Sequence, residues 1–367
     1  MESKKSLFEV FKEIPDPRRQ GGNLLYPLEE LMFLTISGVL CGMEDWVHIS
    51  EFGKDQIIWL RKYFPYENGV PSHDCLGDVF SNLDTDLFGE AFIKWTSSLS
   101  DQTQGEVISI DGKRVRGSYD NHKGKSAIHI VSAFASENGL VMGQLKCIDK
   151  SNEIKTIPDL LDLISVQGCL VTIDAMGCQK KIAEKIKENE ADYVLSLKAN
   201  QEELFEEVKK AFEFMPVDQT DEQVNVGHGR VEKRCCEIIT DLRFIDEATK
   251  WKGIKSIVRI NAQRHHKLTG KQEKEYRYYI SSISDERKIN QAVKLHWSIE
   301  NQLHWVLDVQ FNEDRSRKRN GSMPQNFGLV TKMVLNLIKQ NPMKGSIKVK
   351  RMKAAWNKEF RQQLLKI

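Results

Sequence analysis

The chain has 367 residues, of which 40% are hydrophobic and 29% are charged. This composition is typical of a folded globular protein and excludes a largely disordered or membrane-embedded chain. A chain of this length predicts two domains, or one large domain with appendages. No apolar run reaches the roughly 18 residues that a membrane-spanning helix needs, and residues 1–10 lack the apolar core of a signal peptide. We therefore expect a cytoplasmic protein.

The cysteines exclude two common kinds of structural cross-link. There are seven of them, an odd number, and none lies in a CxxC pair. This pattern predicts reduced thiols, and it argues against a disulfide framework or a structural zinc site.

Basic residues cluster although the formal net charge is only +2. Residues 341–367 contain eight Lys or Arg and a single acid, Glu359. A second dense run consists of Arg315, Arg317, Lys318 and Arg319. Such clusters suggest a polyanionic partner. The alternative is that they are the solvated faces of helices.

The first hundred residues carry the pattern of helices. Apolar residues recur at helical spacing in 28–41, 46–64 and 84–97. Pro15, Pro17 and a pair of glycines interrupt the chain before these segments. We expect an all-helical N-terminal domain over residues 1–100.

From residue 105 the pattern changes to strands. Apolar runs rich in β-branched residues, separated by turn residues, occupy 107–112, 126–136 and 140–149. They are followed by a helix over 156–164, a strand over 169–175, a helix over 179–190, a strand over 192–199 and a helix over 200–214. This order is that of a ribonuclease-H-like mixed sheet flanked by helices, which is an α/β fold.

The rest of the chain departs from that alternation. Residues 216–284 contain further β-like runs, so we expect a β-rich insertion there. A long helix is predicted over 286–311 and another over 322–340. We assign residues 101–340 to one α/β domain and residues 341–367 to a basic C-terminal helix.

Two aspartates follow apolar strands in the same way. Asp111 ends VISID and precedes Gly112, and Asp174 ends LVTID and precedes Ala175. Sheets of α/β proteins place functional groups at the carboxyl ends of strands, beside small residues that let a ligand approach. The alternative is that each aspartate caps a turn or the following helix.

Glu300 lies in a helical stretch with an unusual face. At 100° per residue its face also carries Val293, His296, Trp297, Leu303, His304, Leu307 and Phe311. We therefore expect Glu300 on the buried side, where a carboxylate needs a cation or hydrogen bonds. A divalent ion shared with Asp111 and Asp174 would meet that need. A salt bridge, or hydrogen bonds to His296 or His304, would also do so.

Three carboxylates suit Mg²⁺ or Mn²⁺, which prefer oxygen ligands. Two such ions can activate an attacking hydroxyl and stabilise a leaving oxygen in phosphoryl transfer. The spacing of His296, Glu300 and His304 does not predict zinc. Two histidines eight residues apart on a helix rise roughly 12 Å, which is too far to share one ion.

Several motifs together resemble a known family. They are IPDPRRQGGNLLYPLEELM (14–32), SIDGKRVRGS (109–118), VTIDAMGCQKKIAEKI (171–186), DYVLSLKANQ (192–201) and HWSIENQLHWVLDVQFNEDRSR (296–317). The sequence resembles the DDE-type bacterial insertion-sequence transposases, including the H-repeat-associated proteins of Rhs elements. The resemblance covers nearly the whole chain.

The resemblance implies roles for residues and domains. Asp111, Asp174 and Glu300 match the family's catalytic, metal-binding triad, which implies Mg²⁺ or Mn²⁺ and two ions. Residues 1–100 match the transposase-associated domain and residues 101–340 the catalytic domain, with 216–284 as its insertion. The implied function is binding of element ends, DNA cleavage and strand transfer by a homodimer. A catalytically idle DNA-binding remnant and a nuclease of the same fold are the alternatives.

The helix of Glu300 departs from the family pattern. Many relatives carry a Tyr, Arg and Lys signature there, but this chain has Val293, His296 and Leu307 at those positions. The DNA contacts that the signature implies therefore cannot be transferred directly. Our candidates for DNA contact are Lys113, Arg114, Arg116, Lys198, His296, Trp297, His304, Arg315 and Arg317. Asn200, at the same presumed sheet edge as Lys198, is a weaker candidate.

Overall fold

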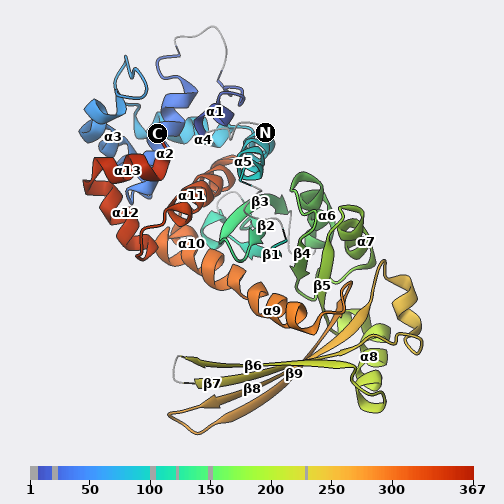
Figure 1. Cartoon of the computed structure of the whole chain (residues 1–367). Helices are drawn as coiled ribbons and strands as arrows, with labels where there is room; N and C mark the ends of the chain where they lie inside the picture. Colours follow the sequence, from blue (N-terminus) through green and yellow to red (C-terminus); the bar gives the residue numbers. More distant parts are fainter. Residues whose placement is uncertain (1–6, 19–23, 100–104, 121–123, 148–151, 228–229) are drawn as a thin grey trace.

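The computed structural model describes residues 7–18, 24–99, 105–120, 124–147, 152–227 and 230–367. Its centre is one mixed sheet of nine strands in the order β3-β2-β1-β4-β5-β9-β8-β7-β6 (Figure 1). The strands are β1 (Val107–Arg114), β2 (His129–Ala135), β3 (Leu140–Cys147), β4 (Leu170–Ile173), β5 (Asp192–Leu197), β6 (Gln219–Gly227), β7 (Arg230–Ile239), β8 (Ser256–His266) and β9 (Gln272–Ser281). The expected mixed α/β architecture is confirmed. The end of the predicted strand 140–149 beyond Cys147 lies outside the described residues.

The first five strands follow one another along the chain as predicted, and their order in the sheet is β3-β2-β1-β4-β5. β1 pairs antiparallel with β2 and parallel with β4, and β5 continues the parallel part. Helices α6 (Glu153–Leu163) and α7 (Lys180–Glu188) pack against this part of the sheet, and α8 (Glu202–Phe214) packs against β9. β1 pairs with β4 only over Val107–Ile110 and continues beside β2 alone from Asp111 to Arg114, so the strand does not end at Asp111 as the sequence predicted.

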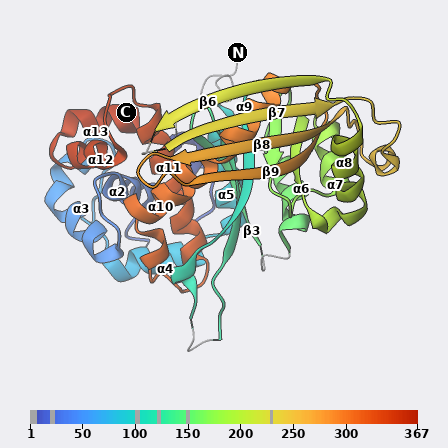
Figure 2. The same cartoon turned by 90° about the horizontal axis from the view of Figure 1, so that it is seen from below.

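The four strands β6–β9 extend the same sheet. β9 pairs antiparallel with β5, and β8, β7 and β6 follow in a meander. They are long, adjacent strands, as the view from below shows (Figure 2). The expected β-rich segment is therefore continuous with the central sheet, because β9 returns to the edge that β5 leaves open.

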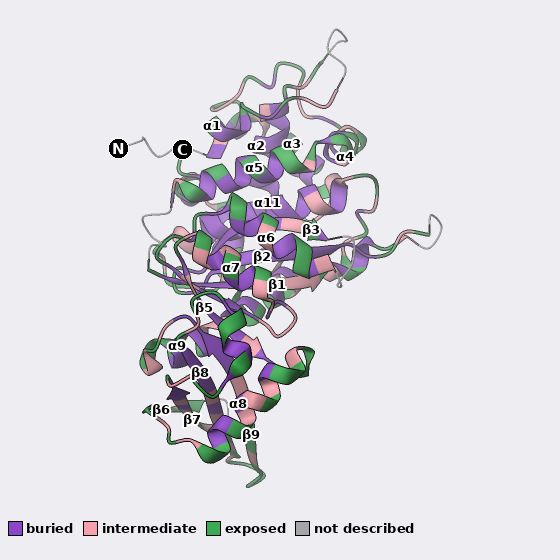
Figure 3. Ribbon diagram, turned by 90° about the vertical axis from the view of Figure 1, so that its right-hand side faces the viewer, coloured by how far each residue is buried: buried purple, intermediate pink, exposed green. Residues whose placement is uncertain are grey.

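Helices from both ends of the chain share one hydrophobic cluster. They are α1 (Leu7–Phe11), α2 (Leu28–Leu40), α3 (Trp46–Leu60), α4 (His73–Asn82), α5 (Thr85–Ser97), α11 (Met323–Gln340), α12 (Ile347–Trp356) and α13 (Lys358–Leu365). Trp46 of α3, for example, contacts Phe327 of α11 with ring centroids 5.2 Å apart. Buried residues continue from these helices into the sheet (Figure 3). The division at residues 100 and 340 stays a prediction.

The basic C-terminal segment is two helices instead of one. α13 begins after Asn357, whose side chain accepts a hydrogen bond from the Phe360 N–H at 2.7 Å. Three cations of residues 341–367 are buried and point inward. Lys350 donates to two backbone carbonyls of residues 338–341, and Arg351 donates to Val39 O at 3.0 Å. Arg361 lies 4.6 Å from the Trp59 ring centroid. Part of this basic run is therefore structural and does not form a surface for a polyanion.

The predicted continuous helix over 286–311 is also interrupted. It consists of α9 (Glu286–His296), a π-helical turn η6 (Glu300–His304) and α10 (Trp305–Gln310). The Trp305 N–H donates to Glu300 O, five residues earlier. In the described part of the chain, no helix is both long and apolar enough to cross a membrane.

Candidate active site

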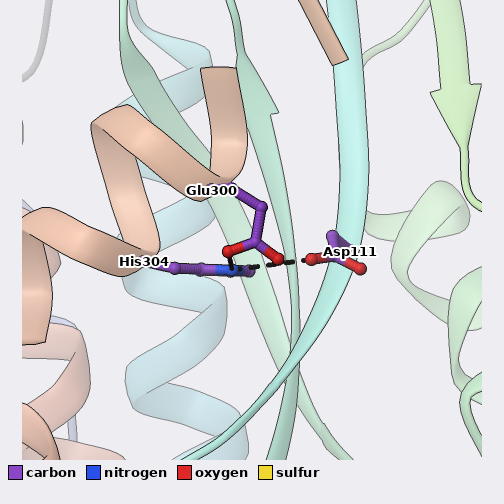
Figure 4. Close-up of side chains that lie close together, drawn as sticks. All are labelled: Asp111, Glu300 and His304. Atoms are coloured by element: carbon purple, nitrogen blue, oxygen red, sulfur yellow. Dashed lines mark ion pairs between the residues drawn. The ribbon is translucent and has the colours of Figure 1, made fainter. Parts of the chain in front are cut away.

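Asp111, Glu300 and His304 lie together where β1 faces the π turn (Figure 4). His304 Nδ1 is 3.5 Å from Asp111 Oδ2 and 3.4 Å from Glu300 Oε2. One ligand atom of each residue lies within 4.8 Å of the other two. Two carboxylate oxygens and one imidazole nitrogen at this spacing can bind a metal ion.

The prediction that Glu300 is buried was wrong. Its side chain is 53% exposed, whereas that of His304 is 6% exposed. Trp297, which was expected on the same buried stripe, is 49% exposed. Both side chains line the cleft, which helical periodicity alone does not record. Glu300 faces the cleft and not the hydrophobic core.

The alternation of β1 explains which of its side chains reach this site. Successive strand residues point to opposite faces, so Asp111 and Lys113 share one face and Gly112 takes the other. On that other face lies a buried pair, His129 and Glu153, joined by a hydrogen bond. A Cβ atom at position 112 would overlap both of their side chains. Glycine is therefore required beside Asp111.

Asp174 lies in the same cleft, at the end of the neighbouring strand β4. Its Oδ1 accepts hydrogen bonds from the N–H groups of Met176 at 3.0 Å and Gly177 at 3.3 Å. The turn-capping alternative therefore describes one of its oxygens. A cleft of about 450 Å³ contains Asp111, Asp174 and Glu300 together. The structure thus brings the three predicted carboxylates into one cavity, with Asp174 outside the compact group of three ligand atoms.

The carboxylates of the cleft have unequal proton affinities. Burial, together with the negative charges of Glu300 and Asp174, raises the pKa of Asp111 to about 8. Hydrogen bonding to His304 lowers the pKa of Glu300. A bound cation would relieve the repulsion that raises the pKa of Asp111.

Lys113 belongs to a separate network of charges on the same face of β1. Its Nζ lies 2.5 Å from both Asp308 Oδ1 and Glu313 Oε2. Burial opposes its charge, but Glu313 and Asp308 raise its pKa. Lys332 Nζ lies 3.9 Å from the other oxygen of Glu313. Lys113 is only 12% exposed, so its charge is engaged inside the protein and does not face solvent.

The other predicted DNA-contact residues fall into two groups. Lys198, His296 and Trp297 line the cleft of Asp111. His296 Nδ1 lies 3.1 Å from Thr172 Oγ1, and burial lowers its pKa. Arg114, Arg116, Arg315 and Arg317 are exposed outside the cleft. Asn200 donates to Ala175 O at 2.6 Å, which indicates a structural role.

The four exposed arginines lie on segments that meet. The 3₁₀ turns η2 (Arg116–Ser118) and η7 (Glu313–Arg315) pack against each other. The Arg116 N–H donates to Asp314 Oδ1 at 3.1 Å, and a Cβ atom at Gly117 would overlap Ser316 O. This contact joins the loop after β1 to the loop after α10, which the sequence had presented as two unrelated basic runs.

One wall of the cleft was missed by sequence reasoning. It comes from β9 and includes Glu275, Tyr276, Arg277 and Tyr278. The guanidinium of Arg277 lies 5.2 Å from the Trp297 ring centroid. The run KEYRYYISSI was identified as β-like, but nothing in its pattern indicates that it returns to β5 and so reaches the site.

Comparisons with known proteins agree with this arrangement. Residues 8–96 match the family described as DDE_Tnp_1-associated, and residues 102–337 match the Transposase DDE domain. The chain therefore belongs to the DDE transposase family, in which metal and DNA binding are typical.

The relatives sharpen this assignment. The chain is 42% identical to "Putative transposase YncI" of Escherichia coli O157:H7, over 98% of this chain and 94% of the relative. It is 36% identical to "H repeat-associated putative transposase YhhI" of Escherichia coli strain K12, over 98% of both chains. The resemblance to the H-repeat-associated proteins is confirmed. A cryo-EM structure of the piggyBac transposase synaptic complex with hairpin DNA aligns with a TM-score of 0.48 and 13% identity, covering 98% of this chain and 76% of that one.

Proposed function

We propose that this protein is a metal-dependent DNA transposase that binds the ends of its element, cleaves the DNA and joins 3′-hydroxyl ends to target DNA. Asp111, Asp174 and Glu300 are the catalytic residues of this proposal. The observation that carries it is their convergence in one cleft, at the point where β1 continues past the end of β4. The order β3-β2-β1-β4-β5 supports a ribonuclease-H-like fold for the sheet.

The residues of the cleft fit divalent cations. Half-buried and exposed carboxylates gather without a Lys or Arg ion pair to Asp111 or Glu300 among the described residues. Oxygen ligands of this kind suit Mg²⁺ or Mn²⁺. When bound, two such ions supply activation of the attacking hydroxyl and charge stabilisation at the leaving 3′-oxygen.

The protein's own groups then position the reactants. The Lys113 network fixes β1 against α10 and so sets the distance from Asp111 to the π turn. Thr172 orients His296 at the floor of the cleft. Lys198, Arg277 and Trp297 offer two cations and an aromatic face to a DNA strand that enters the cleft. The exposed arginines of η2 and η7 extend this basic surface.

Assembly follows from the reaction. Both ends of an element must be held together for their joint insertion, so we propose a homodimer on double-stranded DNA in the bacterial cytoplasm. The helices of residues 1–100 would recognise the ends or hold the two subunits together.

The test is incubation of purified protein with DNA that carries the element's terminal repeats, with Mg²⁺ or Mn²⁺. We expect 3′-hydroxyl release at the ends and joined products, and we expect Asp111→Asn, Asp174→Asn and Glu300→Gln each to abolish both. Glu206→Gln, a surface carboxylate of α8, is the matched control. Cleavage without joining would favour a nuclease. Binding without cleavage by the wild type would favour an idle remnant.

A further inference from the structure

His304 has no role in the triad, yet it forms the most compact group in the cleft. Its Nδ1 lies 3.4 Å from Glu300 Oε2 and 3.5 Å from Asp111 Oδ2. An ion with ligand distances of about 2.1 Å holds its ligand atoms no more than about 4.2 Å apart. Both distances lie within that span, so one ion can contact the nitrogen and both carboxylates.

Glu300 and His304 lie four positions apart, a spacing at which helical side chains are neighbours. They are the first and last residues of the π turn. Such turns are rare inside α-helices and occur frequently at functional sites. Here the turn exposes Glu300 to the cleft and keeps His304 buried beneath it, so two side chains of one helix face Asp111 from different depths.

The imidazole of His304 is buried with its Nδ1 toward the carboxylates of Asp111 and Glu300. Only 5% of the residue is exposed, and its Nε2 has no hydrogen-bond partner among the described residues. A hydrogen bond at Nε2 therefore does not account for the position of this ring, and its Nδ1 is the nitrogen that faces both carboxylates. By contrast, His296 on α9 is tied to Thr172 through its Nδ1.

We propose that His304 is a direct nitrogen ligand of the cation held by Asp111 and Glu300. This inference rests on the proposed function, because it adds a fourth residue to the metal site of the triad. One imidazole with two carboxylates is a mixed ligand set. It favours Mn²⁺ over Mg²⁺, since Mg²⁺ selects oxygen ligands almost without exception.

Pulsed electron paramagnetic resonance on the Mn²⁺-loaded full-length protein tests this directly. A histidine nitrogen bonded to Mn²⁺ produces a nuclear coupling that ¹⁵N-histidine labelling changes in a defined way. We expect this coupling in the wild type. We expect His304→Gln to lose it and to weaken Mn²⁺ binding at least about tenfold. His296→Gln is the matched control, because it removes the other histidine of the cleft, and it should keep the coupling.

The outcomes separate this inference from the proposed function. Mn²⁺ that binds through Asp111 and shows no histidine coupling would overturn the role of His304 and leave the triad intact. A coupling that His296→Gln removes and His304→Gln keeps would overturn it as well. Mn²⁺ binding that Asp111→Asn leaves unchanged would remove the metal site itself. Labelling the wild type needs no variant, so a failure of His304→Gln to fold leaves the test decisive.

Discussion

Two neighbouring clusters of charged side chains lie between β1 and the segment that runs from the π turn into α10. The negative charge is neutralised by lysines in one cluster and not in the other. In the first cluster, Asp111 faces Glu300 and His304. In the second, two residues along the same face of β1, Lys113 faces Asp308 and Glu313. His304 and Asp308 are four residues apart, so they lie on the same side of the helix. Asp111 and Lys113 lie likewise on the same face of β1.

The difference lies in where the positive charge comes from. The second cluster contains its own cations, Lys113 and Lys332, and burial of Glu313 is offset so well that its pKa is lowered. In the first cluster the described residues supply only histidines, and the pKa of Asp111 is raised to about 8. A structural cluster is neutralised by the chain itself. A binding cluster leaves its charge to be neutralised by a ligand.

The largest expected effect comes from breaking the neutralised cluster. Lys332→Met leaves Glu313 buried with one cation fewer, so we expect the free energy of unfolding to fall by about 3–5 kcal/mol. Urea unfolding at pH 7.5 measures it. The double variant Lys332→Met, Glu313→Gln should recover part of the loss. A loss below about 1 kcal/mol for the single variant would show that the chain does not depend on this neutralisation.

Lys318 is a buried cation and can be compared with the carboxylates of the two clusters. Burial lowers its pKa to about 8, and its Nζ lies 3.8 Å from the Phe327 ring centroid. The pKa of lysine in an unfolded chain is about 10.4, so between pH 8 and that value the unfolded chain binds more protons and folding gains stability. Relative to Lys318→Met, the wild type should therefore gain about 1–3 kcal/mol between pH 7.5 and 10. Unfolding curves that keep the same difference at both pH values would contradict this.

In the cleft, replacing a charged side chain by a neutral one should stabilise the folded protein. Asp111→Asn removes a charge that burial and its neighbours disfavour, so in the presence of EDTA it should raise the free energy of unfolding by more than about 1 kcal/mol. Urea unfolding with and without EDTA measures it. Asp308→Asn, the matched substitution in the neutralised cluster, should destabilise the protein instead. Equal signs for the two variants would remove the distinction between the clusters.

The exposed arginines should affect DNA and not folding. Arg315→Ala with Arg317→Ala should weaken binding to end DNA about tenfold at low salt and reduce the salt dependence by about two phosphate contacts. The free energy of unfolding should change by less than about 0.5 kcal/mol. Binding isotherms at several salt concentrations check this, and unchanged isotherms would count against both residues.

Much of the fold followed from local pattern, and the parts that did not have physical reasons. The strands and helices from 107 to 214 have alternation and spacing that any pleated strand or amphipathic helix must show. The return of β9 to β5 depends on pairing across the chain, which no local pattern records. Likewise, the motif SIDGKR does not indicate that Lys113 forms an ion pair, because its partner Asp308 lies 195 residues away.

The carboxylates show the same limit. Asp111 and Asp174 were placed correctly in one cleft, but only Asp174 follows the end of its strand, because β1 continues past Asp111 to Arg114. Glu300 was expected on the buried side because its helical face carries apolar residues, but part of that face lines the cleft. Hydrophobic periodicity does not distinguish a face that packs in the core from one that lines a cleft.

Calorimetric titration of Mn²⁺ into the purified protein, into Asp111→Asn and into Asp308→Asn compares the two clusters directly. If the cleft is the cation site, the wild type and Asp308→Asn bind Mn²⁺, and Asp111→Asn loses that binding. If Asp111→Asn binds Mn²⁺ as tightly as the wild type, the cleft is not a metal site.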